Sequence, residues 1–372
     1  MRAQATTVER GLRVEWLSTP ADLQSVEMAW RALEATVAHR THVSTFDFLF
    51  TWYKHYAGNY GGTPLIGLAW HGSDLAAAAP LTVRRGSLAR IPVTRIDFAP
   101  NDSIAGEFLV RDDRLDALST LLDSLVRTVR FDVICLNGFE PESPTLEALQ
   151  TLARRSRLAT YLEEHAFAMV DLSQGYDRYW ASLTGNMRRK VNQRTRRIEE
   201  MGAAVDGVLV TSSDDIDERI RRMIAVNEAS YKLEGRPLAT HHREFLAEVT
   251  RRFAARNMLS LPILSIGGRD AAYILGVVER GSFYDVTLAY DESFASLGPG
   301  VFLMQRTLQT LADADVHTVI SHGAHDYKRH WATTFVPQRR MFLFSPRPFA
   351  AAARLVRFHL QPLWRQTVGS RQ

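Results

Sequence analysis

The segment SHGAHDYKRHW, residues 321–331, concentrates side chains that could do chemistry, with three histidines, an aspartate, a tyrosine and a lysine. Histidine titrates near neutral pH and can transfer protons or bind a metal, and tyrosine can donate a proton to a leaving group. The histidines are spaced by three and five residues, and no His-Glu-x-x-His pattern accompanies them. The segment therefore predicts proton transfer rather than a metal site.

A second segment of chemical interest is SLGPGVFLMQRTL, residues 296–308, in which Gly298-Pro299-Gly300 precedes a stretch with helical apolar spacing. Glycines let the backbone approach a ligand closely, and free amides at a helix N-terminus favour a phosphate. A tight turn without a ligand has the same composition. Its place between one strand and a final strand followed by a Tyr-Lys pair resembles the order in GNAT acyltransferases, and this resemblance implies a pyrophosphate site.

A third segment, GNMRRKVNQRTRRIEEMG, residues 185–202, carries six cations between Arg188 and Arg197. A solvated helix face, a grip on cofactor phosphates, and contact with an anionic acceptor or lipid surface all remain open. The run has no interleaved aromatic residues and no DNA-binding motif, so nucleic acid is an improbable partner.

The elements that must position these segments follow one order twice. Each half is expected to contain helices, an antiparallel meander of strands, one more helix and a late strand. This order predicts an α+β fold of two similar domains, each a mostly antiparallel sheet flanked by helices. The expected boundaries are 1–165, 166–345 and a basic amphipathic C-terminal helix over 346–372.

Composition limits the remaining choices. The 372 residues carry a net charge of +4, and the single cysteine, Cys135, excludes an intramolecular disulfide and lies in an apolar strand pattern. No signal peptide and no stretch of about 18 apolar residues is evident, which favours the cytoplasm. The C-terminal helix would gather five apolar residues on one side and serve as a packed terminal helix or as a peripheral anchor on the inner membrane. These residues are Phe349, Val356, Leu360, Leu363 and Trp364.

The chain resembles tandem GNAT acyltransferases of the BioF-like or CelD-type acetyltransferase family, which are relatives of Fem-type aminoacyltransferases and include proteins similar to bacterial ceramide synthases. Ala295 and Val319 stand where the family often has polar residues. The resemblance covers nearly the whole chain and rests on the segments AWRAL, FDFLFTWYKHYAG, LAAAAPLTVRR, APNDSIAGEFLV, LTGNMRRKVNQRTRRIEEMG, NEASYKLEGRP, FYDVTLAYDESFASLGPGVFLMQRTL and GAHDYKRHWA.

The resemblance implies transfer of an acyl group from acyl-CoA to an amine, such as an amino lipid or an amino sugar, by direct attack and without a metal. It implies one working site in the second half, with the first half shaping the acceptor side. The implied cofactor-binding residues are Leu297, Gly298, Pro299, Gly300, Val301, Phe302 and Lys328.

Tyr327 is the implied acid that protonates the departing thiolate. His325, Asp285 and Glu228 compete as the base that takes the proton from the amine, and the residues leave this choice open. The implied acceptor-binding residues are Asn101, Asp102, Tyr231 and His322. A Fem-type transferase that uses aminoacyl-tRNA and a non-catalytic binding module remain as alternatives.

Overall fold

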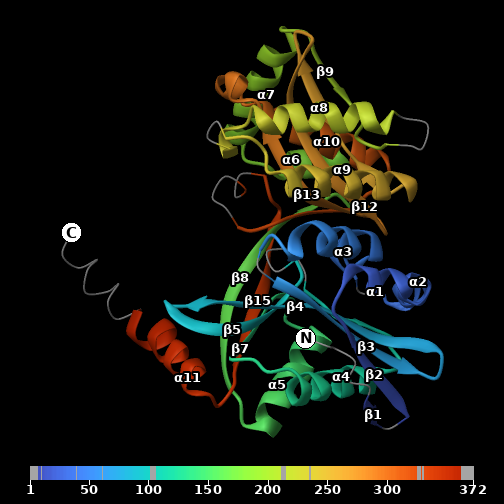
Figure 1. Ribbon diagram of the computed structural model, residues 1–372. Helices are drawn as coiled ribbons and strands as arrows, with labels where there is room; N and C mark the ends of the chain where they lie inside the picture. Colours follow the sequence, from blue (N-terminus) through green and yellow to red (C-terminus); the bar gives the residue numbers. More distant parts are fainter. Residues whose placement is uncertain are drawn as a thin grey trace. The chain divides into compact units, whose positions relative to one another are not determined.

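The computed structural model describes residues 7–9, 11–38, 40–60, 62–100, 106–210, 215–233, 236–324, 328 and 331–361. The chain divides into two compact units (Figure 1). Unit 1 comprises Met1–His165 and Pro337–Gln372, and unit 2 comprises Ala166–Val336. This division differs from the expected boundary after residue 345, because the chain returns to unit 1 at Pro337. The described part of the C-terminal segment packs within unit 1 and forms no separate domain.

Unit 1 is built on a sheet in which β1 to β5 follow one another as antiparallel neighbours, and β7 then joins β5 in parallel. The parallel pair requires a crossover, which α4 provides. The strands are β1 (Thr7–Glu9), β2 (Leu12–Leu17), β3 (Gly62–His71), β4 (Asp74–Leu88), β5 (Ile91–Phe98), β6 (Leu109–Val110) and β7 (Val133–Phe139). The helices are α1 (Pro20–Ser25), α2 (Glu27–Thr36), α3 (Phe46–Trp52), α4 (Leu115–Thr128), α5 (Pro144–Ser156) and α11 (Pro348–Leu355).

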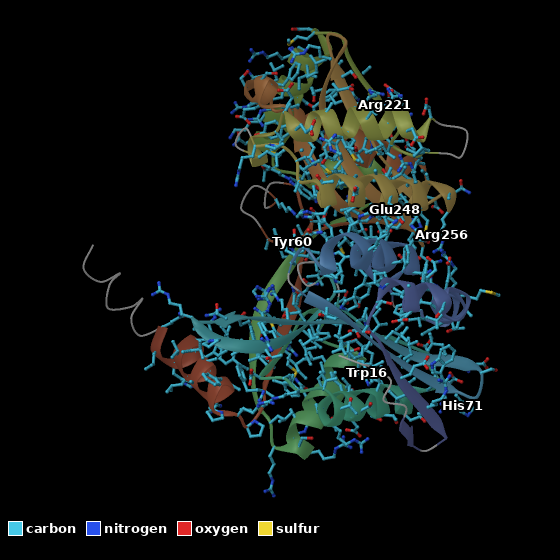
Figure 2. All side chains as sticks on the ribbon, in the orientation of Figure 1. Trp16, Tyr60, His71, Arg221, Glu248 and Arg256 are labelled. Atoms are coloured by element: carbon cyan, nitrogen blue, oxygen red, sulfur yellow. The ribbon has the colours of Figure 1, made fainter. Side chains whose placement is uncertain are left out.

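Helices cover both faces of this sheet, which explains why β3 is a continuous apolar run rather than an alternating one. Leu65 and Ala69 pack with α4 and α5, whereas Ile66 and Leu68 pack with α2 and α3. Trp16 of β2 lies over β3, and its indole N–H donates to Ser124 Oγ of α4 at 3.1 Å (Figure 2). This side of the sheet is therefore fixed to α4 by packing and by a buried hydrogen bond.

In unit 1, β5 and β7 pair in parallel as far as Asp97 and Cys135. Beyond this pair, other residues of the same unit fill the space between the two strands. The ring of Phe98 packs edge-on against Phe108 at 5.6 Å and against Phe139 at 5.7 Å, measured between centroids. Gly106 passes so close that a Cβ there would lie 2.1 Å from the carbonyl oxygen of Asn137. Aromatic packing thus closes the point at which these two strands separate.

Unit 2 repeats the same plan. Its antiparallel order β9-β11-β12-β13 is followed by α10, and β14 then joins β13 in parallel. The helices are α6 (Gly175–Ser182), α7 (Gly185–Glu199), α8 (Ile216–Glu228), α9 (Thr240–Ala255) and α10 (Pro299–Asp313). The strands are β9 (Ala203–Asp206), β10 (Leu259–Ser260), β11 (Ile263–Ile266), β12 (Arg269–Glu279), β13 (Ser282–Tyr290) and β14 (Thr318–Ser321). The repeated topology confirms the predicted fold class.

Two further strands carry the chain between the units. β8 (Ala159–Asp171) pairs with β14 in unit 2, and β15 (Thr334–Phe344) pairs with β7 in unit 1. β15 was not predicted from the sequence, because its centre, PQRR, interrupts the apolar alternation.

The C-terminal helix differs from the expected amphipathic pattern. Phe349, placed on the apolar side by the sequence, is 58% exposed, whereas Ala350 and Ala353 are buried against unit 1. Leu363 and Trp364 lie outside the described residues. No helix in the described part of the chain is long and apolar enough to cross a membrane. Attachment of this segment to a membrane surface stays a prediction.

The carboxyl group of Glu107 should make the stability of the protein depend on pH. This residue lies between Gly106 and Phe108, in the segment that packs where β5 and β7 separate. Burial raises its pKa from 4.5 to about 7, although hydrogen bonds from Ser143 and Thr145 oppose the shift. The folded state therefore holds this proton over a range in which the unfolded chain has lost it, so stability falls as the pH rises from 4.5 through 7. The free energy of unfolding, measured with urea, should fall across this pH range by about 3 kcal/mol less in Glu107→Gln than in the unaltered protein.

The matched control is Glu142→Gln, at a nearby exposed carboxylate that does not contribute to the Glu107 shift. It should leave the difference in unfolding free energy between pH 5 and pH 8 as in the unaltered protein. An unchanged difference in Glu107→Gln would contradict the assignment.

Candidate functional site

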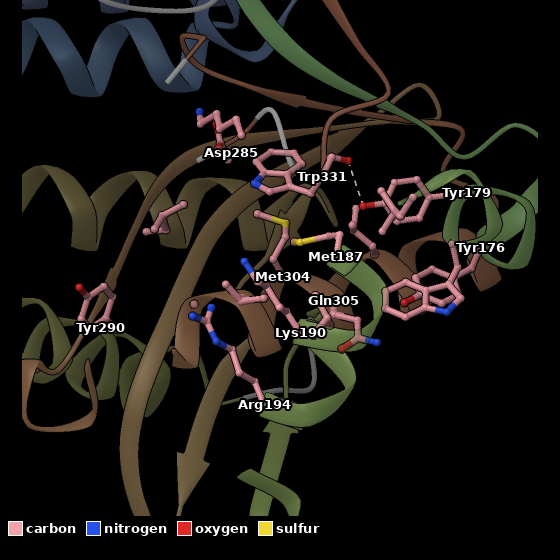
Figure 3. Close-up of a pocket in the computed structure, with 18 of the residues that line it drawn as sticks. Tyr176, Tyr179, Met187, Lys190, Arg194, Asp285, Tyr290, Met304, Gln305 and Trp331 are labelled. Atoms are coloured by element: carbon pink, nitrogen blue, oxygen red, sulfur yellow. Dashed lines mark hydrogen bonds between the residues drawn. The ribbon is translucent and has the colours of Figure 1, made fainter. Parts of the chain in front are cut away.

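Unit 2 contains a cavity of about 890 Å³ enclosed by α6, α7, β13, α10 and the segment after β14 (Figure 3). Its wall is mostly apolar and aromatic, with cations and one carboxylate at intervals. The lining residues are Tyr176, Tyr179, Trp180, Leu183, Thr184, Asn186, Met187, Lys190, Val191, Arg194, Lys232, Asp285, Val286, Thr287, Leu288, Tyr290, Gly300, Val301, Met304, Gln305, Leu308, His322, Lys328 and Trp331.

One end of the cavity is formed by the N-terminus of α10. Gly298 caps the helix in the left-handed conformation, with a φ of 69°, and Pro299 follows as the first helical residue. A Cβ on Gly300 would meet nothing within 4 Å, so the backbone here is open to the cavity. Arg194 of α7 lies against Gly298, because its guanidinium would be 3.2 Å from a Cβ at that position. A helix N-terminus and a cation thus converge at one point.

The charge of the cavity wall favours an anionic ligand. Among the described residues, four cations face the cavity with one carboxylate, Asp285; the cations are Lys190, Arg194, Lys232 and Lys328. Within the described part of the chain, Lys190 and Arg194 form no ion pair. Cations that lack a protein partner and line a cavity attract phosphate or carboxylate groups.

The middle of the cavity is apolar. Met187 and Met304 approach each other from α7 and α10, with Trp331 beside them (Figure 3). Tyr179, buried in α6, donates its hydroxyl to the carbonyl oxygen of Trp331 at 3.0 Å and so holds that residue in place. An elongated ligand with a flexible, weakly polar centre would fit between the charged ends.

The other end of the cavity is formed where β13 and β14 separate. Their parallel pairing ends at Tyr284 and Ile320. On the opposite side of β13 the register with β12 shifts between Leu275 and Gly276, which leaves Val286 as an extra, bulged residue. Bulges re-aim the backbone and release amides from the ladder. Val286 lines the cavity at this point.

A chain of hydrogen bonds holds the two strands where they separate. Lys328 Nζ donates to Ser321 Oγ at 2.7 Å, and the Ser321 hydroxyl donates to the carboxylate of Asp285. The same carboxylate accepts the backbone N–H of His322 at 3.1 Å. Burial lowers the pKa of Lys328, and the Asp285 charge opposes this shift. Asp285 therefore stabilises both the strand ends and a buried cation.

Several of the residues predicted to bind a cofactor line the cavity or form the turn beside it. Gly300, Val301 and Lys328 line the cavity, and Gly298 with Pro299 form the turn that starts α10. The side chains of Leu297 and Phe302 instead belong to the hydrophobic core of unit 2. Their apolar character serves packing, and only their backbone is near the helix N-terminus.

The predicted catalytic and acceptor residues separate into three groups. Asp285 and His322 line the cavity. Glu228 is not part of its wall and forms an exposed ion pair with Arg243. The last group lies outside the described residues and comprises Tyr327, His325, Asn101, Asp102 and the side chain of Tyr231.

Lys232 was not predicted as a site residue from the sequence. Lys190 and Arg194 were not distinguished there from the other cations of α7. A helical signal was present, since positions 187, 190, 191 and 194 follow the spacing of one helix face. These four residues do line the cavity together. No group of three or more His, Cys, Asp or Glu side chains within the described ranges could hold a metal ion.

Residues 185–329 match the family model described as an acetyltransferase (GNAT) domain. The match includes α7, the bulged strand β13, α10 and the residues up to Arg329. Unit 2 is a GNAT-type acyltransferase domain. No curated protein matches the chain in sequence.

Solved structures similar to the chain extend over both units. L-PGS from Bacillus licheniformis has a TM-score of 0.57 at 11% identity, and the alignment covers 89% of this chain and 95% of that one. FemX has a TM-score of 0.57 at 11% identity, with 84% and 95% covered. The C-terminal domain of a putative lysylphosphatidylglycerol synthetase from Agrobacterium fabrum has a TM-score of 0.55 at 10% identity. The alignment covers 90% of this chain and 97% of that one. These likenesses show the fold alone, and with the repeated topology they confirm the predicted arrangement of two similar domains in tandem.

The network at the separated strands of the GNAT domain predicts a coupling that can be measured. Asp285→Ala leaves the Ser321 hydroxyl and the buried Lys328 ammonium without the carboxylate, which should cost about 2–4 kcal/mol of unfolding free energy. The double variant with Lys328→Met should recover part of this loss, because the uncompensated cation is gone. Urea unfolding of the two single variants and the double variant measures the coupling, and additive losses would contradict the network.

Proposed function

We propose that the GNAT domain transfers an acyl group from acyl-CoA to an amine by direct attack on the thioester. The observation that carries this proposal is one continuous cavity with a cationic helix N-terminus at one end and a bulged, separated strand at the other. The cationic end suits the phosphates of CoA, and the bulged end suits a thioester carbonyl. The acceptor is an amine of an amino lipid or an amino sugar.

The residues of the cavity fit such a donor in three parts. Gly300 leaves room for a pyrophosphate beside the free amides of α10, and Arg194 and Lys190 supply positive charge. Met187 and Met304 border the apolar middle, which suits the arm of the donor between its phosphates and its sulfur. The thioester would then reach the end near Asp285.

The chemistry at that end requires three contributions. The amine must lose a proton, the carbonyl oxygen must be stabilised as it gains charge, and the thiolate must be protonated. Backbone amides near the Val286 bulge are the proposed donors to the oxygen, His325 the proposed base and Tyr327 the proposed acid. Asp285 is proposed to position Ser321 and Lys328 rather than to accept the proton, because its carboxylate already accepts hydrogen bonds.

A covalent acyl-enzyme step through cysteine finds no support. Cys135 is the sole cysteine and lies in β7 of unit 1. Burial raises the pKa of its thiol to about 12, so the reactive thiolate is scarce at neutral pH. Direct transfer between the two bound substrates is therefore favoured.

An aminoacyl-tRNA donor is the second candidate, and the outer side of α7 favours it. Arg189, Arg196 and Arg197 are exposed cations outside the cavity wall, and none has an ion-pair partner within the described part of the chain. A polyanion could contact them together with Arg194. The similarity in fold to FemX agrees with this alternative, although the Gly300 opening suits CoA equally well.

Filling the space beside Gly300 should prevent donor binding without unfolding the domain. Gly300→Phe should abolish the thermal stabilisation by CoA, because the new ring occupies open space at the α10 N-terminus. Gly58→Phe is the matched control, at a glycine that also has nothing within 4 Å and has an ordinary φ of −64°. A CoA response that persists in Gly300→Phe would refute this site.

Charge removal on α7 should separate the two candidate donors. Arg194→Met should weaken CoA binding about tenfold through the loss of a charge-assisted contact, whereas Arg189→Met on the outer side should leave it unchanged. If aminoacyl-tRNA is the donor, CoA should not stabilise the protein at all. In that case Arg189→Met and Arg196→Met should weaken tRNA binding, as measured by filter retention at fixed salt.

A further inference from the structure

The positive charges of the GNAT cavity are not grouped at one place. Arg194 lies against Gly298, where the proposed function puts the donor phosphates. Lys232 instead follows α8, in the turn Tyr231–Leu233, and lines the wall formed by β13. Since the donor phosphates occupy the α10 end, Lys232 requires another explanation.

Lys232 is held against the strand that carries the bulge. Its Nζ donates to the carbonyl oxygen of Leu288 at 2.5 Å, two residues beyond Val286. An ammonium has three protons, and this bond uses one of them. The remaining donors of a group fixed in this way are available to a ligand in the cavity.

The described residues supply no carboxylate for this cation. Asp285 is the single acidic side chain among the described residues of the cavity wall, and its oxygens accept hydrogen bonds from Ser321 and from the backbone of His322. Its charge also balances the buried Lys328. Within the described residues Lys232 forms no ion pair, and burial lowers its pKa, with only a partial offset from Asp285.

Among the described residues of the wall, four cations face one carboxylate, and an anionic ligand group would balance this excess of positive charge. An acceptor whose amino group is protonated would be repelled by Lys232 and Lys328, unless the same molecule also carried a negative charge. Both arguments lead to the same ligand chemistry.

We infer that Lys232 binds a carboxylate carried by one of the two substrates at the reacting end of the cavity. This inference rests on the proposed function and narrows its substrates to an acidic amine or to an acyl group that ends in an acid. Lys232 acts here as a specificity residue that orients the substrate. It takes no part in bond formation.

The test compares substrates that differ only in this charge. The acceptor arm pairs amino acids with their carboxamides, with acetyl-CoA as the donor. The donor arm pairs succinyl-CoA with pentanoyl-CoA at a fixed amine. Release of the CoA thiol is followed with a thiol reagent. The unaltered enzyme should prefer the carboxylate member of one pair by about tenfold or more in kcat/KM, and the arm that shows the preference identifies the substrate that carries the acid.

Two Lys232 variants and one control make the outcome decisive. Lys232→Met should reduce the preference to within about twofold, and Lys232→Arg should keep it, since both cations bind carboxylates. Lys190→Met should weaken all CoA thioesters alike and leave the preference intact. No preference in either pair, or one that survives in Lys232→Met, would overturn the inference. If CoA does not stabilise the unaltered protein, that result would count against the proposed function rather than against the role of Lys232.

Discussion

The separation of β13 from β14 beyond Tyr284 and Ile320 is the constraint on which the candidate site depends. Two parallel strands that stay paired leave no room for a ligand. Strands that separate must satisfy the backbone and side-chain groups that are released. Asp285, Ser321 and Lys328 meet this requirement through one chain of hydrogen bonds. At this point polar side chains, rather than backbone pairing, connect the two strands.

Unit 1 demonstrates the opposite solution on the same topology. Its parallel pair β5–β7 also ends early, at Asp97 and Cys135. The connection to α4 is longer there, and it brings Phe108 and Gly106 back against the sheet. Aromatic packing stabilises that unit and removes the space that a ligand would need. The repeated fold therefore supports one cavity of this type in unit 2, while the corresponding place in unit 1 is part of the core.

The sequence was informative where local chemistry decides the structure. The turn at Gly298 and the start of α10 follow from glycine and proline preferences. It was uninformative where long-range pairing decides. β15 forms because β7 offers an edge, and Lys232 reaches the cavity because its turn packs beside β13. Neither partner lies near these residues in the chain, so periodicity alone could not reveal them.

The two roles of α7 link the packing of the domain to its ligand. Val191 and Ile198 are the buried residues of this helix, and they share its inner side with Lys190 and Arg194. Such a small apolar contact gives modest stabilisation, and further support comes from polar bonds to α10, such as Thr195 Oγ1 to Gln305 Oε1 at 2.8 Å. An anion between the two helices would neutralise the cations that now repel one another along α7. Ligand binding would then stabilise the docking of the helix that forms the binding site, because the same inner side serves both.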